Sequence, residues 1–212
     1  MSEKRGFHHG DLKNEIIKQG LKIIAKKGFK AVELKDIAKA CGVSTPSIYR
    51  HFSNKDSLME SLLFNVAEIF YDFLATGVNS DLSREPKENL VYMGLRFVKF
   101  SQEYPRYFEF LFYSGFERHL NLGVDLHLKY CHEKNSFELF KQEVIKYLND
   151  RGIKDNYNLH IINLWAYISG LAGIVDSLDV VDKDKILAEY ISSMVQTYTL
   201  GITHTDNRGD SI

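Results

Sequence analysis

In the first quarter of the chain, apolar residues recur every three or four positions, which is the spacing of one face of an α-helix. This pattern predicts a helix over residues 11–28, with Asp11 as its cap, and a second helix over residues 33–41. Gly42 follows the second helix and can adopt the left-handed conformation that a sharp turn requires. A third helix is predicted over residues 44–52. The N-terminal segment is therefore expected to fold as three short helices.

The remaining chain continues this helical periodicity over longer stretches. A cap at Ser53, with Asp56 three residues on, precedes the next helix. Residues 77–85 are the clearest loop, and the dipeptide Tyr104-Pro105 interrupts the helix that follows this loop. The fold class is therefore expected to be all-α, with a three-helix N-terminal domain followed by a helical domain. The longer helices are predicted over residues 53–75, 86–103 and 125–150, followed by two C-terminal helices.

The charges divide unevenly along the chain. The protein has 212 residues, of which 44% are hydrophobic and 26% are charged, and its formal net charge is −1. Residues 1–55 contain twelve Lys and Arg against five Asp and Glu, a net charge of +7, whereas residues 56–212 carry −8. A basic N-terminal domain on an acidic body is typical of a protein that meets a polyanion. A solvated helical surface rich in lysine would give the same count, so charge alone leaves both interpretations open.

The composition also indicates a compartment. The two cysteines lie 90 positions apart and cannot form a disulfide framework, which favours a reducing environment. No apolar run reaches the length of a transmembrane helix, and the N-terminus lacks the apolar stretch of a secretory signal. We therefore expect a cytoplasmic protein that does not associate with a membrane.

A helix, a glycine-containing turn and a second helix form the layout of a DNA-reading helix-turn-helix. The second helix of such a pair lies in the major groove, so short polar side chains near its start can reach bases or phosphates. Ile48 and Phe52, four positions apart, are expected to point back into the domain's own core. Many three-helix cores share this layout, which makes the pattern weak by itself. The polar residues of this helix are Ser44, Thr45 and Ser47 near its start and Tyr49 and His51 further along.

The order and spacing of several short motifs resemble the DNA-binding domain of the tetracycline-repressor (TetR) family. The resemblance spans about residues 9–60 and implies a homodimeric transcriptional regulator, usually a repressor, that a small molecule releases from its operator DNA. Glu33 is a departure, because the family often carries Ser or Thr at this cap. An acidic residue there suits the helix dipole but cannot donate a hydrogen bond to a phosphate. The motifs are His9-Gly10-Asp11-Leu12, Leu34-Lys35-Asp36-Ile37-Ala38, Gly42-Val43-Ser44, Ile48-Tyr49-Arg50-His51-Phe52 and Lys55-Asp56-Ser57-Leu58.

The resemblance implies DNA contacts position by position. Lys55, at the start of the fourth helix, would bind a phosphate, and Arg50 would bond either DNA or an acidic residue of its own domain. Lys4 and Arg5 belong to an arm that would reach an adjacent groove or the backbone. Most of these contacts would position the domain rather than read bases, so the affinity is expected to fall steeply with salt. The predicted DNA contacts are Lys4, Arg5, Lys35, Ser44, Thr45, Ser47, Tyr49, Arg50, His51 and Lys55.

Aromatic residues are dense over residues 97–113, which favours an apolar ligand pocket in the body. For each ring taken alone, ordinary core packing is the simpler interpretation. The implied effector is a small apolar or aromatic molecule, and its identity stays open. The predicted pocket residues are Phe97, Phe100, Tyr104, Phe108, Phe112 and Trp165.

Two apolar stripes near the C-terminus predict an association surface. One follows alternating steps of three and four along a helix, and the other follows steps of four along the last helix. Two such helices per subunit can form a four-helix seam in a homodimer, and paired heads would double the base contacts. The alternative is that both stripes are buried within one subunit. The predicted interface residues are Leu164, Ile168, Leu171, Val175, Tyr190, Met194 and Tyr198.

The run over residues 165–170 also resembles the WHG-type C-terminal subgroup of the TetR family. The resemblance rests on Trp165 and Gly170. Ser169 stands where the subgroup carries His, so a ligand role of that His does not transfer to this chain.

Metal and enzyme interpretations have little support in the sequence. His127 and Cys131 lie four positions apart and His132 is adjacent, but two ligands on one helix face fall short of a closed zinc site. His119 and His160 do not complete one. No phosphate-binding glycine loop or nucleophile motif occurs. We therefore expect no metal, no cofactor and no catalysis.

The expected function is ligand-responsive regulation of transcription, most simply by a repressor that binds palindromic operator DNA as a homodimer. An activator or a ligand sensor of the same fold is the alternative. A helical enzyme using the aromatic pocket, or a helical interaction module that does not bind DNA, has less support. The expected domains are residues 1–55 for DNA binding, 56–203 for ligand binding and dimerisation, and 204–212 as a flexible tail.

Overall fold

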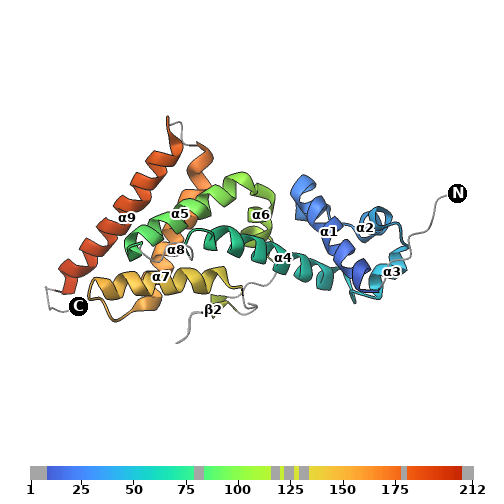
Figure 1. Cartoon of the computed structure of the whole chain (residues 1–212), viewed down its shortest axis with the longest axis horizontal. Helices are drawn as coiled ribbons and strands as arrows, with labels where there is room; N and C mark the ends of the chain where they lie inside the picture. The colour runs from blue at the N-terminus through green and yellow to red at the C-terminus, as the bar shows by residue number, and fades with distance from the viewer. Residues whose placement is uncertain are drawn as a thin grey trace. The chain divides into compact units, whose positions relative to one another are not determined.

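The computed structural model of the protein is almost entirely helical in the part of the chain that it describes (Figure 1). The strands in that part, β1 (Leu120–Asn121) and β2 (His127–Leu128), are two residues long and pair antiparallel. The expected all-α fold is therefore confirmed. The described residues are 9–78, 84–115, 120–121, 127–128, 134–177 and 181–206.

The helices follow one another as the sequence periodicity predicts. The α-helices are α1 (His9–Lys27), α2 (Leu34–Cys41), α3 (Thr45–Tyr49), α4 (Lys55–Ala75), α5 (Pro86–Glu103), α6 (Pro105–Tyr113), α7 (Ser136–Asp150), α8 (Tyr157–Ile174) and α9 (Lys183–Asp206). The described residues include two single-turn 3-10 helices. The first, η1 (Phe29–Ala31), comes between α1 and α2, and the second, η2 (Val175–Ser177), directly follows α8.

The chain divides into two compact units. The head unit consists of Met1–Ile69 and Tyr104–Glu117, and the body unit consists of Phe70–Glu103 and Arg118–Ile212. Helix α4 begins in the head unit and ends in the body unit, because the division falls within this helix. Helix α6 belongs to the head unit although it comes after α5 in the sequence.

The head unit is built around isoleucines from its first three helices. Ile16 and Ile24 of α1 have no exposed surface, and the same is true of Ile37 in α2 and Ile48 in α3. Helix α2 packs against both α1 and α3. Burying a side chain of this size contributes about 1.5–3 kcal/mol, so the burial of these four residues stabilises the packing of the three helices.

Two glycines form the turns that separate these helices. Gly28 follows α1 with a φ of 84°, and its N–H donates to the carbonyl of Ile24 at 2.8 Å. Gly42 follows α2 in the left-handed region, with φ 69° and ψ 27°. A residue with a Cβ atom would be strained in the conformation of Gly42. Both predicted helix ends are therefore confirmed.

Helix α6 completes the core of the head unit. The rings of Phe29 and Phe110 stack with centroids 5.4 Å apart, and Phe110 and Leu111 are buried. Tyr107 Oη donates a hydrogen bond to the carbonyl of Leu21 at 3.2 Å. Burial raises the pKa of the Tyr107 phenol above its ordinary value. These contacts fix α6 against α1 and η1.

The body unit has its core among α5, α7, α8 and α9. Helix α5 packs against each of the other three helices. Val144 of α7, Ile161 of α8 and Val195 of α9 belong to one buried cluster. Tyr147 and Thr199 are buried as well, and their hydroxyls satisfy each other at 2.7 Å. These two hydroxyls therefore enter the core with their hydrogen bonding satisfied.

The C-terminal end of α4 is held by side chains of the body unit. The last carbonyls of a helix lack an intrahelical partner and carry partial negative charge. Arg96 donates to the carbonyl of Phe73 from Nε at 2.9 Å and from Nη2 at 2.6 Å. Tyr92 Oη donates to the carbonyl of Thr76 at 3.0 Å. This end of α4 is thus anchored by a cation and a phenol.

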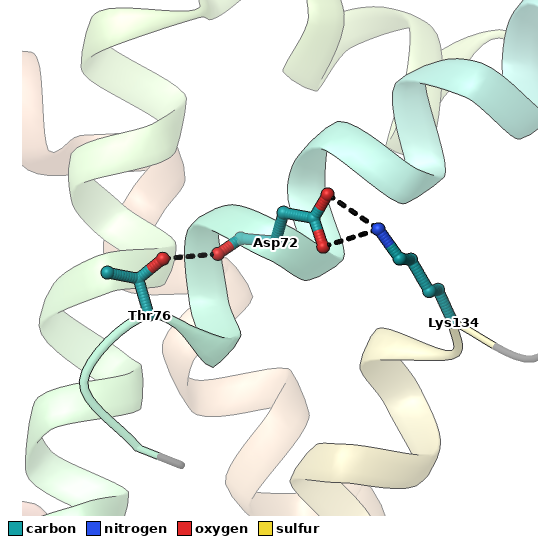
Figure 2. Close-up of polar contacts among 3 residues, drawn as sticks. All are labelled: Asp72, Thr76 and Lys134. Carbon is teal, nitrogen blue, oxygen red and sulfur yellow. Dashed lines mark hydrogen bonds and ion pairs between the residues drawn. The ribbon is translucent and has the colours of Figure 1, made fainter. Parts of the chain in front are cut away.

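An ion pair attaches the same end of α4 to the start of α7 (Figure 2). Lys134 Nζ lies 2.8 Å from both carboxylate oxygens of Asp72. On the other side, Thr76 Oγ1 donates to the carbonyl of Asp72 at 2.7 Å. The side chains of Lys134 and Asp72 are 46% and 58% exposed, and exposed pairs contribute about 0–1 kcal/mol. The pair therefore orients the two segments more than it stabilises them.

Two helix starts differ from the prediction. Helix α1 begins at His9, two residues before the expected cap at Asp11. Helix α4 is capped by Asn54 instead of Ser53. Asn54 Oδ1 accepts a hydrogen bond from the N–H of Ser57 at 2.8 Å, and Ser57 Oγ accepts from the N–H of Asn54 at 3.3 Å. This reciprocal pair is a capping box that lies one residue later than the predicted one.

Two helices are shorter than predicted. The helix expected over residues 125–150 begins only at Ser136, because Asn135 Oδ1 accepts hydrogen bonds from the N–H groups of the next turn at 3.0 Å. The expected range also includes β2. Helix α3 ends at Tyr49, and the chain then turns so that Phe52 enters the core.

Candidate nucleic-acid interface

Helix α3 has one side in the core of the head unit and another side in solvent. Ile48 is fully buried and Phe52, just beyond the helix, is 5% exposed. These are the two residues that the sequence predicted to hold the helix in place. Tyr49 lies between them in sequence and is 51% exposed. Its phenol is therefore available to donate a hydrogen bond to a phosphate.

The start of α3 presents small hydroxyl side chains. Ser44 occupies the N-cap position with an extended backbone, but its side chain makes no cap hydrogen bond. Its Oγ lies 2.9 Å from Ser47 Oγ instead. Ser44 therefore occupies the N-cap position of α3 without a capping hydrogen bond from its side chain. Thr45 is partly exposed at the first position of the helix, so three hydroxyls gather at this end.

The other predicted contacts differ in exposure. Lys35 of α2 and Arg50 after α3 are exposed, whereas His51 is partly buried. Among the residues that the structure describes, Arg50 has no acidic partner within ion-pair distance. Lys4 and Arg5 lie outside the described residues.

Lys55, the first residue of α4, forms an ion pair that the sequence analysis did not foresee. Its Nζ lies 3.2 Å from Oε1 of Glu33, the residue just before α2. The two side chains are 43% and 52% exposed. No short-range pattern could have indicated this pair, because its members are 22 positions apart.

Lysine side chains line the exposed surface of α1. Lys18, Lys22 and Lys26 are exposed or partly exposed, and Lys18 Nζ lies 3.6 Å from a carboxylate oxygen of Glu15. A hydrogen bond from Gln19, with smaller contributions from Lys18 and Lys22, holds the pKa of Glu15 below its ordinary value. Lys22 and Lys26 therefore add positive charge to the exposed surface of α1, whereas Lys18 is paired with Glu15.

The predicted pocket aromatics of the body unit pack against other rings. Phe97 and Phe100 both contact Phe70, with centroids 5.7 and 4.8 Å apart. Trp165 of α8 contacts Phe137 of α7 at 4.7 Å. These contacts are what the core-packing interpretation expects. None of these three contacts connects Trp165 with Phe97 or Phe100.

The other predicted pocket residues belong to the head unit. Phe108 and Phe112 pack together on α6 with centroids 4.6 Å apart. Tyr104, just before α6, is 39% exposed and stacks with Tyr107 at 6.2 Å. A ligand role for all six aromatics stays a prediction.

An open groove of about 470 Å³ lies along α8 and α9. Tyr198 accepts a hydrogen bond from Asn163 Nδ2 at 3.1 Å, and its hydroxyl lies 2.8 Å from Nδ1 of His160. Burial raises the pKa of Tyr198. The polar lining was missed in the sequence analysis, which followed apolar steps only. The groove is lined by Asn163, Leu164, Tyr167, Tyr190, Ser193, Met194, Thr197 and Tyr198.

The first predicted association stripe is largely covered within the single chain. Leu164, Ile168, Leu171 and Val175 are at most 8% exposed there, which fits the alternative interpretation of packing inside the subunit. Tyr167, also on α8, is 42% exposed. Of the predicted interface residues, Leu164 on α8 and Tyr190, Met194 and Tyr198 on α9 line the groove. A role of either stripe in association stays a prediction.

The described part of the chain offers neither a metal site nor a membrane span. No group of three His, Cys, Asp or Glu side chains comes together there in a way that could hold a metal ion. His119, Cys131 and His132 lie outside the described residues. Within the described residues, no helix is both long enough and apolar enough to span a membrane.

The head unit is a helix-turn-helix with an outward-facing second helix, and the body unit is a helical bundle, so the chain has the architecture of a helix-turn-helix regulator. Residues 16–62 match the family described as "Bacterial regulatory proteins, tetR family". The head unit is therefore similar to the N-terminal domain of the TetR family of transcriptional regulators.

Several curated relatives share the N-terminal part of the sequence. An uncharacterised HTH-type transcriptional regulator, YerO of Bacillus subtilis, is 31% identical over 93 residues, covering 42% of this chain and 31% of the relative. IcaR of Staphylococcus epidermidis, a negative transcriptional regulator of the biofilm operon icaADBC, is 30% identical over 63 residues, covering 30% of this chain and 34% of IcaR. The chain thus spans about a third of the length of these relatives.

Solved structures share the fold over most of the chain. A protein of unknown function from Rhodococcus sp. RHA1 has a TM-score of 0.68 at 16% identity, covering 93% of this chain and 98% of that one. RolR in complex with resorcinol has a TM-score of 0.57 at 14% identity, covering 88% of both chains. At these identities the likeness establishes the fold.

Proposed function

We propose that the protein is a transcriptional repressor that binds operator DNA with α3 in the major groove. The observation that carries this proposal is the two-sided character of α3. Ile48 holds the helix from inside, while Tyr49 and the hydroxyls of Ser44 and Ser47 face solvent. Side chains in this arrangement can reach base edges and phosphates as the helix enters a groove.

The sign of regulation is taken from the relatives. IcaR is described as a negative regulator, and KstR2 of Rhodococcus jostii, 26% identical over 77 residues, as a transcriptional repressor. A repressor acts by occupying its operator, so it needs DNA binding and no further activity. We assign DNA binding to residues 1–55, ligand binding and dimerisation to residues 56–203, and no specific role to the tail over residues 204–212.

We further propose that the protein acts as a homodimer. One head has few side chains that can reach base edges, so recognition of an operator by paired heads is the simplest arrangement. The groove along α8 and α9 supports this surface as the contact, because Tyr167 and Tyr190 are 42% and 46% exposed beside it. Exposed aromatic residues around a hollow are typical of interface cores.

A small apolar or aromatic molecule is proposed to release the DNA. Support comes from the aromatic residues that the body unit contains, among them Phe97, Phe100 and Trp165. RolR, which has the same fold, was solved in complex with resorcinol. From RolR we infer only the chemical class of the effector and not its identity.

The proposal is tested by selecting duplexes from a random-sequence pool with the full-length protein and measuring their binding by mobility shift. Tyr49→Ala is expected to lower the affinity for the selected duplex about tenfold, because it removes a hydrogen bond to a charged phosphate. Tyr113→Ala is the matched control, since Tyr113 is 62% exposed on α6 of the same unit. If no duplex is enriched, or both variants bind like the wild type, the placement of α3 on DNA is wrong.

A further inference from the structure

The ion pair between Glu33 and Lys55 connects two helix starts in the head unit. Glu33 precedes α2, Lys55 begins α4, and their charged atoms are 3.2 Å apart. Both side chains are about half exposed. Another charged group can therefore approach either side chain from solvent without any change in the core of the unit.

The carboxylate of Glu33 makes no hydrogen bond to the start of α2. Glu33 occupies the N-cap position with φ −125° and ψ 134°, but its side chain makes no cap hydrogen bond. Its backbone carbonyl accepts from the N–H groups of Asp36 and Ile37 at 3.1 and 3.2 Å, and any residue could supply that carbonyl. The described partner of the carboxylate is Lys55.

We propose that Glu33 competes with DNA phosphate for Lys55 and thereby sets a lower affinity of the head for DNA. The inference rests on the proposed function, since it assumes that Lys55 faces a phosphate in the complex. Glu33 is then an affinity-determining residue whose charge opposes binding, although it lies in a basic domain.

The physical argument compares two partners for one ammonium group. An exposed ion pair contributes only about 0–1 kcal/mol, so a phosphate can displace the carboxylate. The displaced carboxylate then remains within a few ångströms of the phosphate, and like charges at that distance repel. If the carboxylate is not displaced, Lys55 is already neutralised and releases fewer counterions from the DNA. Either way, an uncharged residue at position 33 favours binding.

The test is Glu33→Gln in the full-length protein. Binding is measured at a series of salt concentrations, on a duplex selected by the wild type and on a random-sequence duplex of equal length. We expect several-fold tighter binding to both duplexes, since phosphate contacts do not depend on sequence. The slope of log affinity against log salt is expected to steepen by about 0.9 per head.

Glu60→Gln is the matched control. It removes the same charge from an exposed side chain of α4 in the same unit, five residues after Lys55 and therefore about 140° around the helix. We expect it to change the affinity and the slope much less. Glu33→Ser serves as a second variant if Glu33→Gln melts at a lower temperature than the wild type.

Lys55→Gln in both backgrounds completes a double-mutant cycle. If the carboxylate competes for Lys55, the loss of the lysine weakens binding more in the Glu33→Gln protein than in the wild type. Equal losses, or unchanged or weaker binding by both Glu33 variants, would overturn the inference while leaving the proposed function intact. Failure of the wild type to bind any duplex would instead reject the proposed function, and this inference with it.

Discussion

Gly42 illustrates how single residues specify the head unit. Its φ of 69° places the turn between α2 and α3 in the left-handed region, and a Cβ atom at this position would meet no atom within 4 Å. A side chain there would therefore cost backbone conformational energy and nothing else. The turn sets the direction in which α3 leaves α2, so the preference of one residue bears on the exposure of Tyr49.

We expect Gly42→Ala to lower the free energy of unfolding by about 1–2 kcal/mol, the cost of the left-handed region for a residue with a Cβ. Urea unfolding of the full-length protein measures this. Gly201→Ala is the control, because Gly201 is helical and exposed and a Cβ atom there would also have no neighbour within 4 Å. It should be neutral or stabilising by up to about 1 kcal/mol. Equal effects of the two substitutions would contradict this account.

Helix α6 is the element whose placement was least expected. Helix α6 is separated from α3 in sequence by α4 and α5, yet it belongs to the head unit. The ring of its Phe110 stacks on the ring of Phe29. Helix α4 is similarly shared, because its N-terminal part lies in the head unit while its C-terminal end is bound by Arg96 and Tyr92. Lys134 of the body unit contacts the same end (Figure 2). The covalent order of the helices therefore does not follow the division into units.

We expect Phe110→Ala to destabilise the protein by about 3–5 kcal/mol, since it removes a fully buried ring. Phe112→Ala, on the same helix, should cost less, because Phe112 is only partly buried. Thermal unfolding followed by circular dichroism distinguishes the two variants. A similar melting temperature for both would show that α6 is not part of the core of the head unit.

For the whole molecule, the groove along α8 and α9 leads to a prediction about assembly. We expect a dimer in solution, and we expect Tyr190→Glu to weaken it by at least about tenfold, because a charge would be buried against the second copy. Leu159→Glu is the control, since Leu159 is 58% exposed on α8 and does not line the groove. Sedimentation at micromolar concentration measures both. A monomeric wild type, or dissociation by Leu159→Glu alone, would reject this surface.

Local rules were sufficient wherever the cause lies within a few residues. The ends of α1 and α2 at Gly28 and Gly42 follow from backbone sterics, and the burial of Ile48 follows from helical spacing. Phe52 is buried as expected, but a turn after the end of α3 brings it into the core. The helix-turn-helix and its polar outer side were therefore predictable, together with the similarity of this part of the chain to the TetR family. Helix starts were less predictable, because several residues near Asn54 could cap α4. Which of them does so depends on the geometry of the hydrogen bond to the N–H of Ser57.

Long-range contacts are what the tertiary structure alone decided. The stripe of Leu164 and Ile168 has the same spacing whether it packs inside a subunit or between subunits, and only the tertiary structure shows how far it is buried within the single chain. The pairing of Glu33 with Lys55 likewise depends on how α2 and α4 approach each other. Periodicity identifies the apolar face of a helix because this face is a local property. It cannot identify the partner of that face, because the partner is determined by packing of residues far apart in the chain.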